Sequence, residues 1–148
     1  MDFEHPKHVC FRCNRCALCC GDTEDRARTI LLMRTEAERI SEKTLKGIGE
    51  FADRIENCEP YTYRMKTVDG KCVFLRENLC TIYDLRPLIC RFYPFELKDD
   101  GRNKHVFAYT DECPCIGVGP ELKRGYFEKL FSESIKAMRE NAKKTRTL

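Results

Sequence analysis

The chain has 148 residues, and its 27 basic and 24 acidic side chains leave a formal charge of only +3, which gives no indication of nucleic-acid binding. No apolar run reaches the roughly 18 residues that a membrane-spanning helix needs. The first residues are polar and acidic rather than those of a signal peptide. We therefore expect one cytoplasmic domain, residues 1–148, with neither a membrane nor nucleic acid among its partners.

The chain also contains eleven cysteines. Cytoplasmic thiols stay reduced, so closely spaced cysteines in such a protein favour metal binding over disulfides. A disulfide framework is the alternative, although an odd number of cysteines would leave at least one of them unpaired.

Four of these cysteines form the run Cys13-x-x-Cys16-x-x-Cys19-Cys20, and Cys10 precedes it. Repeated two-residue spacings let thiolates converge on one metal, as in iron–sulfur proteins and, in paired form, in zinc ribbons. Neighbouring side chains of an extended backbone point to opposite sides, so Cys19 and Cys20 are not expected to serve one site in the same way. The run predicts a metal-binding protein.

Short elements follow this run. An apolar strand is expected at residues 29–33. The capping box formed by Thr35 and Glu38 predicts the start of a helix that continues to about Leu45. A second short helix is expected at residues 51–57.

The middle of the chain is predicted to contain hairpins. Residues 63–75 indicate a hairpin that turns at Asp69-Gly70, a pair suited to positive φ angles. Strands are also expected at 95–97 and 106–109, separated by a turn at 99–101. His105 is expected to lie in a predicted strand, as a surface or hydrogen-bonded histidine without a catalytic role.

The last element has the clearest pattern. Apolar residues recur every three or four positions, which predicts an amphipathic helix from about Glu121 to Lys143. We expect its aromatic stripe to pack in the core, with a groove for a partner protein as the alternative. Together these elements predict a small α+β domain organised around a cysteine metal site.

The later cysteines are spaced more widely. Pro87 suits the first turn of a short helix, which is expected to present Cys90 at its far end. Arg86 and Arg91 flank this helix and are predicted to donate hydrogen bonds to cluster sulfides or thiolates. A role as ordinary surface arginines is the alternative. The remaining cysteines of this half are Cys72, Cys80, Cys113 and Cys115.

The cysteines and their neighbours, in this order, resemble the YkgJ-like CxxCxxCC family of zinc- or iron-chelating domains. The resemblance covers residues 13–117 and rests on the run at 13–20, Gly70-x-Cys72, the block from Cys80 to Pro94, and Cys113-Pro114-x-Ile116-Gly117. It implies eight metal-linked cysteines, namely Cys13, Cys16, Cys19, Cys20, Cys72, Cys80, Cys90 and Cys113.

Cys10, Cys58 and Cys115 fall outside the family pattern. Cys115 stands where the family usually has glycine, so it could compete with Cys113 as a ligand. The cysteine block also resembles that of the flagellin lysine N-methylases, which implies an iron–sulfur-dependent methyl transfer. Those proteins are longer, and this chain lacks their extra region.

Eight thiol donors without a histidine fit an iron–sulfur cluster or two all-thiolate zinc sites. The cysteines from 72 to 113 are separated by 8, 10 and 23 residues, so they form no second zinc knuckle. A run of two-residue spacings is more typical of a [4Fe-4S] cluster. Zinc alone, or one cluster plus one zinc, stays open as an alternative. The Cys-x-x-x-Cys-x-x-Cys run of radical-SAM enzymes is absent, because position 23 is Thr23.

Three functions are compatible with this sequence. The first is a redox or electron-transfer role with an unidentified protein partner. The second is an enzyme, either an oxidoreductase or a cluster-dependent protein lysine methyltransferase. The third is a structural zinc module that binds another protein. The sequence has no glycine-rich phosphate loop and no Ser-His-Asp set, so it identifies no catalytic residue.

Overall fold

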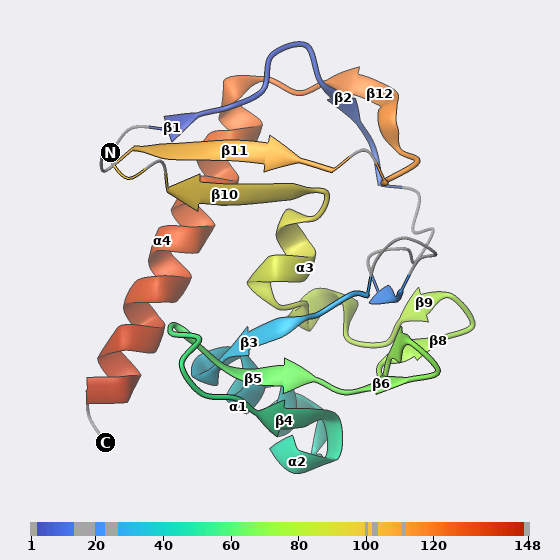
Figure 1. The fold of residues 1–148 in the computed structure, drawn as a ribbon, viewed down its shortest axis with the longest axis vertical. Helices are drawn as coiled ribbons and strands as arrows, with labels where there is room; N and C mark the ends of the chain where they lie inside the picture. The colour runs from blue at the N-terminus through green and yellow to red at the C-terminus, as the bar shows by residue number, and fades with distance from the viewer. Residues whose placement is uncertain are drawn as a thin grey trace.

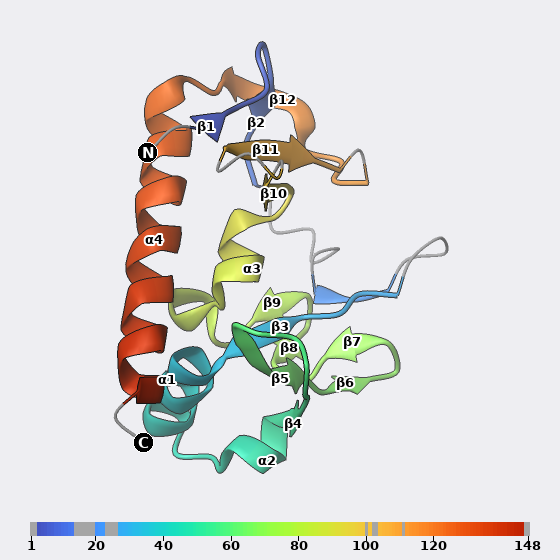
Figure 2. The same ribbon diagram turned by 60° about the vertical axis from the view of Figure 1, so that its left-hand side comes forward.

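A long C-terminal helix, α4 (Arg124–Arg146), runs along one side of the molecule and connects two layers of short strands (Figure 1). The computed structural model describes residues 3–13, 20–22, 27–99, 101, 104–110 and 112–146. One layer lies beside the first turns of α4, and the other lies near its last turns, where α1 (Arg34–Thr44) contacts it (Figure 2). The fold is mixed α+β, as the sequence predicts.

The first layer is a three-stranded sheet in the order β1-β11-β10. β1 (Phe3–Glu4) is parallel to β11 (His105–Tyr109), and β10 (Phe95–Asp99) is antiparallel to it. β2 (Cys10–Phe11) and β12 (Ile116–Glu121) form a separate antiparallel pair. The aromatic face of α4 covers this layer, and the core between them contains Phe3, Phe95, Phe107, Phe127, Leu130 and Phe131. The prediction that the stripe packs inside the protein is confirmed.

The second layer is a three-stranded antiparallel sheet in the order β3-β5-β4. Its strands are β3 (Leu31–Met33), β5 (Tyr61–Met65) and β4 (Ala52–Arg54), and α1 and α2 (Ile48–Phe51) pack beside them. A second core contains Ile30, Leu32, Ile40, Phe51, Met65, Cys72, Phe74 and Ile82. Cys72 belongs to this core, and three other motif cysteines pack against it.

Two small hairpins lie on the side of the molecule away from α4 (Figures 1 and 2). The first joins β6 (Thr67–Val68) to β7 (Lys71–Cys72), and the second joins β8 (Leu75–Arg76) to β9 (Leu79–Cys80). The predicted turn at Asp69-Gly70 is confirmed, since both residues have positive φ angles, 52° and 77°. The chain then continues through the 3-10 helix η2 (Tyr83–Leu85) to α3 (Leu88–Phe92), which lies between the two layers.

The structure corrects two helix predictions in the second layer. The capping box at Thr35 and Glu38 is wrong, because α1 begins at Arg34 and Glu36 accepts the backbone N–H of Met33 at 2.9 Å. The hydroxyl of Thr35 instead donates to Asn141 on α4. The helix expected at 51–57 is also wrong. The segment 52–54 pairs with β5, and this ladder outweighs its local helical preference.

Other boundaries are closer to expectation. The strands predicted at 95–97 and 106–109 are confirmed as β10 and β11, and His105 begins β11. Of the turn between them, Asp100 lies outside the described residues. The final helix starts at Arg124 rather than Glu121, because the residues before it pair with β2.

None of the described helices combines the length and the apolar character needed to cross a membrane.

Candidate metal centre

Four of the predicted ligands surround the second core. Cys72 is a buried member of that core, and Cys20, Cys80 and Cys90 pack against it. They come from four separate places in the chain: the residues before Gly21, the end of β7, the end of β9 and the middle of α3. Cysteines that the sequence separates by up to 70 residues therefore lie at one hydrophobic core.

A single bridge aligns the first two of these cysteines. Gly21 forms an antiparallel bridge with Lys71, and the N–H of Asp22 donates to the carbonyl of Gly70 at 2.8 Å. Residues on either side of a bridge are brought alongside each other, so Cys20 and Cys72 become cross-strand neighbours. Glycine suits position 70, because its φ is +77° and a Cβ there would lie 2.9 Å from the Asp22 carboxylate. The bridge positions the end of the cysteine run against the hairpin.

The third cysteine is positioned by the β8–β9 hairpin. Cys80 pairs with Leu75, and both the N–H and the hydroxyl of Thr81 donate to the carbonyl of Phe74, at 2.9 and 2.7 Å. These bonds hold Thr81 against Phe74, whose side chain is buried and which is only two residues from Cys72. The hairpin thereby holds Cys80 near the same core as Cys72.

A buried carboxylate positions the fourth cysteine. Pro87 is the N-cap of α3, and Cys90 is the third of its five residues rather than lying at its far end. The N–H of Leu88, at the start of this helix, donates to Glu36 Oε2 at 2.5 Å. Burial raises the pKa of Glu36, although the two backbone donors and the charge of Arg91 oppose this shift. Sequence analysis missed Glu36, whose only local sign is its place in the first turn of α1.

The other motif cysteines lie around β2 and β12. Ile116 pairs with Phe11, which brings the segment containing Cys113 to the strand that leads into Cys13. Cys113 and Cys115 are both buried, whereas Cys13 is exposed. Gly119 allows the two strands to approach, because its φ is +90° and a Cβ there would lie 2.7 Å from that of Arg12.

One member of this second group, Cys13, acts on Tyr126 of α4. Burial raises the pKa of the Tyr126 hydroxyl, the charge of Cys13 raises it further, and the charge of Arg86 lowers it. Cys13 and Arg86 are therefore both within electrostatic reach of one tyrosine. Cys16 and Cys19, which would continue the run toward Cys20, lie outside the described residues.

The two arginines predicted to support a cluster have partners within the fold. Arg86 donates from Nε to the carbonyl of Tyr83 at 2.9 Å, and its guanidinium lies 3.8 Å from the centre of the Tyr83 ring. Arg91 forms an ion pair with Glu133 at 3.6 Å, while its buried Nε has no hydrogen-bond partner among the described residues. That Arg86 or Arg91 donates a hydrogen bond to a bound cluster stays a prediction.

The family model for the CxxCxxCC family, described as a "putative zinc- or iron-chelating domain", matches residues 12–114. The chain belongs to this family. The match contains all eight predicted ligands, and it leaves out Cys10 and Cys115.

Two uncharacterised proteins from Methanocaldococcus jannaschii are similar to this CxxCxxCC chain. One is 29% identical over 150 residues, which covers 95% of this chain and 48% of the relative. The other is 27% identical over 92 residues, which covers 61% of this chain and 47% of the relative. The chain thus spans about half the length of the relatives that it matches. No solved structure matches it significantly.

The predicted cysteine ligands are chemically suited to zinc and iron, the metals named in the family description. Within the described ranges, no three histidine, cysteine, aspartate or glutamate side chains are grouped closely enough to hold a metal ion. However, four cysteines lie at the second core in apolar surroundings, and thiolates bind both zinc and iron–sulfur clusters. The cysteine residues present are therefore suited to such a group.

Proposed function

We propose that this chain is a redox protein that binds a [4Fe-4S] cluster through cysteine thiolates. The observation that supports the proposal is that Cys20, Cys72, Cys80 and Cys90 all belong to or pack against one apolar core. With Cys13, Cys16, Cys19 and Cys113, they form the ligand set from which the cluster would take its thiolates. When bound, such a cluster supplies a one-electron redox centre.

Iron–sulfur chemistry is favoured over zinc by the way the cysteines are distributed. A zinc knuckle takes two ligands from one tight turn. Here Cys72, Cys80 and Cys90 each come from a different element, β7, β9 and α3. The chain thus offers one closely spaced run and several single thiols, a pattern that suits a cluster better than two paired zinc sites.

The protein's own contribution is to position and shield the thiols. Phe74 and Ile82 are 6% exposed, so the second core excludes water from one side of the cysteine group. Burial and nearby hydrogen-bond donors are the levers by which a protein adjusts a cluster's reduction potential. Glu36, by holding the start of α3, fixes the helix from which Cys90 projects.

A spectroscopic redox titration tests this function. Anaerobically purified protein should absorb broadly in the visible region, lose part of this absorbance on addition of dithionite, and regain it with a mild oxidant. Zinc has no redox chemistry in proteins. A colourless protein whose spectrum is unchanged by either reagent would favour the structural zinc module instead.

A further inference from the structure

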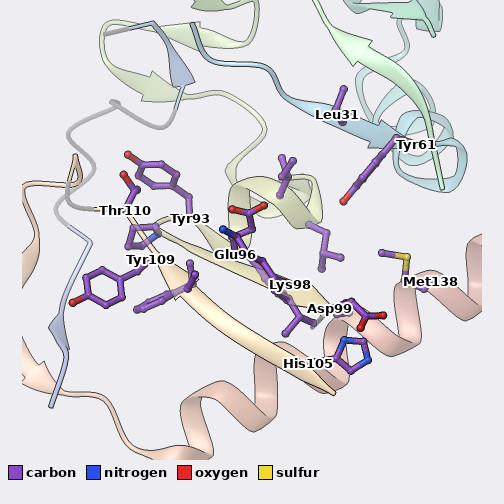
Figure 3. A pocket seen from close by; sticks show the side chains of 18 of the residues that line it. Leu31, Tyr61, Tyr93, Glu96, Lys98, Asp99, His105, Tyr109, Thr110 and Met138 are labelled. Carbon is purple, nitrogen blue, oxygen red and sulfur yellow. The ribbon is translucent and has the colours of Figure 1, made fainter. Parts of the chain in front are cut away.

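A cavity of about 830 Å³ follows the full length of β10 (Figure 3). Its walls come from α3, β3, Tyr61, β11 and the middle of α4, and all five residues of β10 line it. Its volume is within the range of known ligand sites. No cysteine of the described ranges lines it, so the cavity is separate from the predicted thiol ligands that the structure describes.

The strand along this cavity has an open edge. Among the described residues, β10 is the last strand of its sheet, with β11 on its other side. The N–H of Thr110 donates to the carbonyl of Pro94, so the even-numbered residues of β10 bond to β11. The backbone N–H and C=O groups of Phe95, Leu97 and Asp99 therefore point away from β11, toward the cavity. An open row of this kind is a template for another strand.

The side chains beside this edge carry charges and aromatic rings. In the view of Figure 3, Glu96 lies near the middle of the cavity, with Tyr61 on one side and Tyr93 on the other. After burial and the charge of Glu36, the charge of Glu96 also raises the pKa of Tyr61, so the two side chains are within electrostatic reach. Within the described ranges, neither Glu96 nor Lys98 forms an ion pair.

We propose that the open edge of β10 binds an extended peptide as an added strand, with a basic side chain beside Glu96 and an acidic one beside Lys98. A peptide is the ligand whose backbone can satisfy a row of alternating donors and acceptors. A carboxylate among tyrosine rings suits a cationic side chain. Since Glu96 and Lys98 are two residues apart, their partners occupy positions two apart on one face of the peptide.

This site is distinct from the proposed redox centre, but the two share α3. Leu88, Ile89 and Phe92 line the cavity, and Ile89 also packs against the second core, as Cys90 does. A bound peptide would therefore contact the helix that carries a predicted ligand. Binding does not require the metal to be iron, so the two proposals can fail independently.

The test uses the purified full chain and synthetic peptides labelled with a fluorophore, measured by anisotropy. The probes are TVKVEVT and TVEVKVT, which match the two charges in a parallel and an antiparallel added strand. One of them should bind at least about tenfold more tightly than the neutral peptide TVQVQVT, because directly opposed charges favour pairing. Failure of both probes to bind would overturn the proposal.

A second pair of measurements separates strand addition from capture of a charged side chain. Methylating alternate backbone nitrogens of the better probe removes its strand donors and should weaken binding by about tenfold or more. If the methylated peptide binds equally well, the cavity recognises the side chain alone, and strand addition is wrong.

Protein variants complete the test. Leu97→Pro removes an N–H that points toward the cavity, so it should abolish peptide binding. This N–H does not bond to β11, so the circular dichroism spectrum should be retained. Glu96→Lys, at an exposed position, should weaken binding of the better probe, and replacing the lysine of that probe with glutamate should restore it. Unchanged binding by Glu96→Lys, or no recovery with the altered peptide, would contradict the proposed register.

Discussion

Glu36 accepts the backbone N–H of Leu88 at 2.5 Å, across 52 residues of sequence. The same carboxylate accepts the N–H of Met33 at 2.9 Å, so one side chain caps the start of both α1 and α3. Such a cap satisfies backbone donors that a helix leaves unpaired at its first turn. Because α3 contains Cys90, Glu36 links the second layer of the fold to the predicted metal site.

The first prediction concerns this buried carboxylate. Glu36→Ala should lower the free energy of unfolding by about 2–4 kcal/mol, because two backbone N–H groups lose their acceptor. Glu38→Ala is the matched control, since Glu38 makes only partly exposed ion pairs and should cost less than about 1 kcal/mol. Urea denaturation measures both. Equal losses in the two variants would show that the cap is not important for stability.

The second prediction concerns pH. Burial raises the pKa of Glu36 above its ordinary value of 4.5, so the folded protein binds this proton more tightly than the unfolded chain. The stability that Glu36 contributes is therefore fully present below pH 4.5 and declines as pH rises through its folded pKa. Glu36→Gln does not titrate, so the stability difference between wild type and this variant should shrink over that window. A difference that grows with pH would show that the pKa is lowered instead.

The parts of the fold that sequence predicted correctly have a local cause. The periodicity of residues in α4 and the turn at Asp69-Gly70 depend on neighbours within a few positions. The role of Glu36 depends on a partner 52 residues away, and residues 52–54 become a strand only because β5 lies beside them. Such long-range contacts produce no periodic pattern in the sequence from which they could be predicted.

The same contrast between local and long-range causes applies to the candidate site. The identity of the predicted cysteines follows from spacing and from a family pattern, both readable along the chain. Their grouping around the second core depends on the bridge from Gly21 to Lys71 and on the β8–β9 hairpin. Neither arrangement has a signature in the sequence beyond the Asp69-Gly70 turn.

The third prediction compares two cysteines. Cys90→Ser should lose metal and become poorly soluble, because metal coordination contributes on the order of 10 kcal/mol, comparable to the stability of a whole domain. Cys58 is exposed and lies outside the family pattern, so Cys58→Ser should retain both properties. Metal analysis of the two purified variants measures the difference. Loss of metal in Cys58→Ser, with retention in Cys90→Ser, would overturn the ligand assignment.

The fourth prediction concerns the neighbouring thiols Cys113 and Cys115. Both are buried, but only Cys113 lies within the part of the chain that the family model matches. Cys113→Gly should therefore lower the metal content, and Cys115→Gly should leave it nearly unchanged. The opposite result would make Cys115 the ligand. Equal losses would mean that both thiols belong to the site.

The most direct test of the redox cluster is the iron, zinc and acid-labile sulfide content of anaerobically purified protein, combined with its Mössbauer spectrum. We predict a brown protein with about four iron and four sulfide per chain, as a [4Fe-4S] cluster requires. The spectrum should show the irons in one exchange-coupled cluster. Stoichiometric zinc without sulfide, in protein produced with ample iron, would contradict the account.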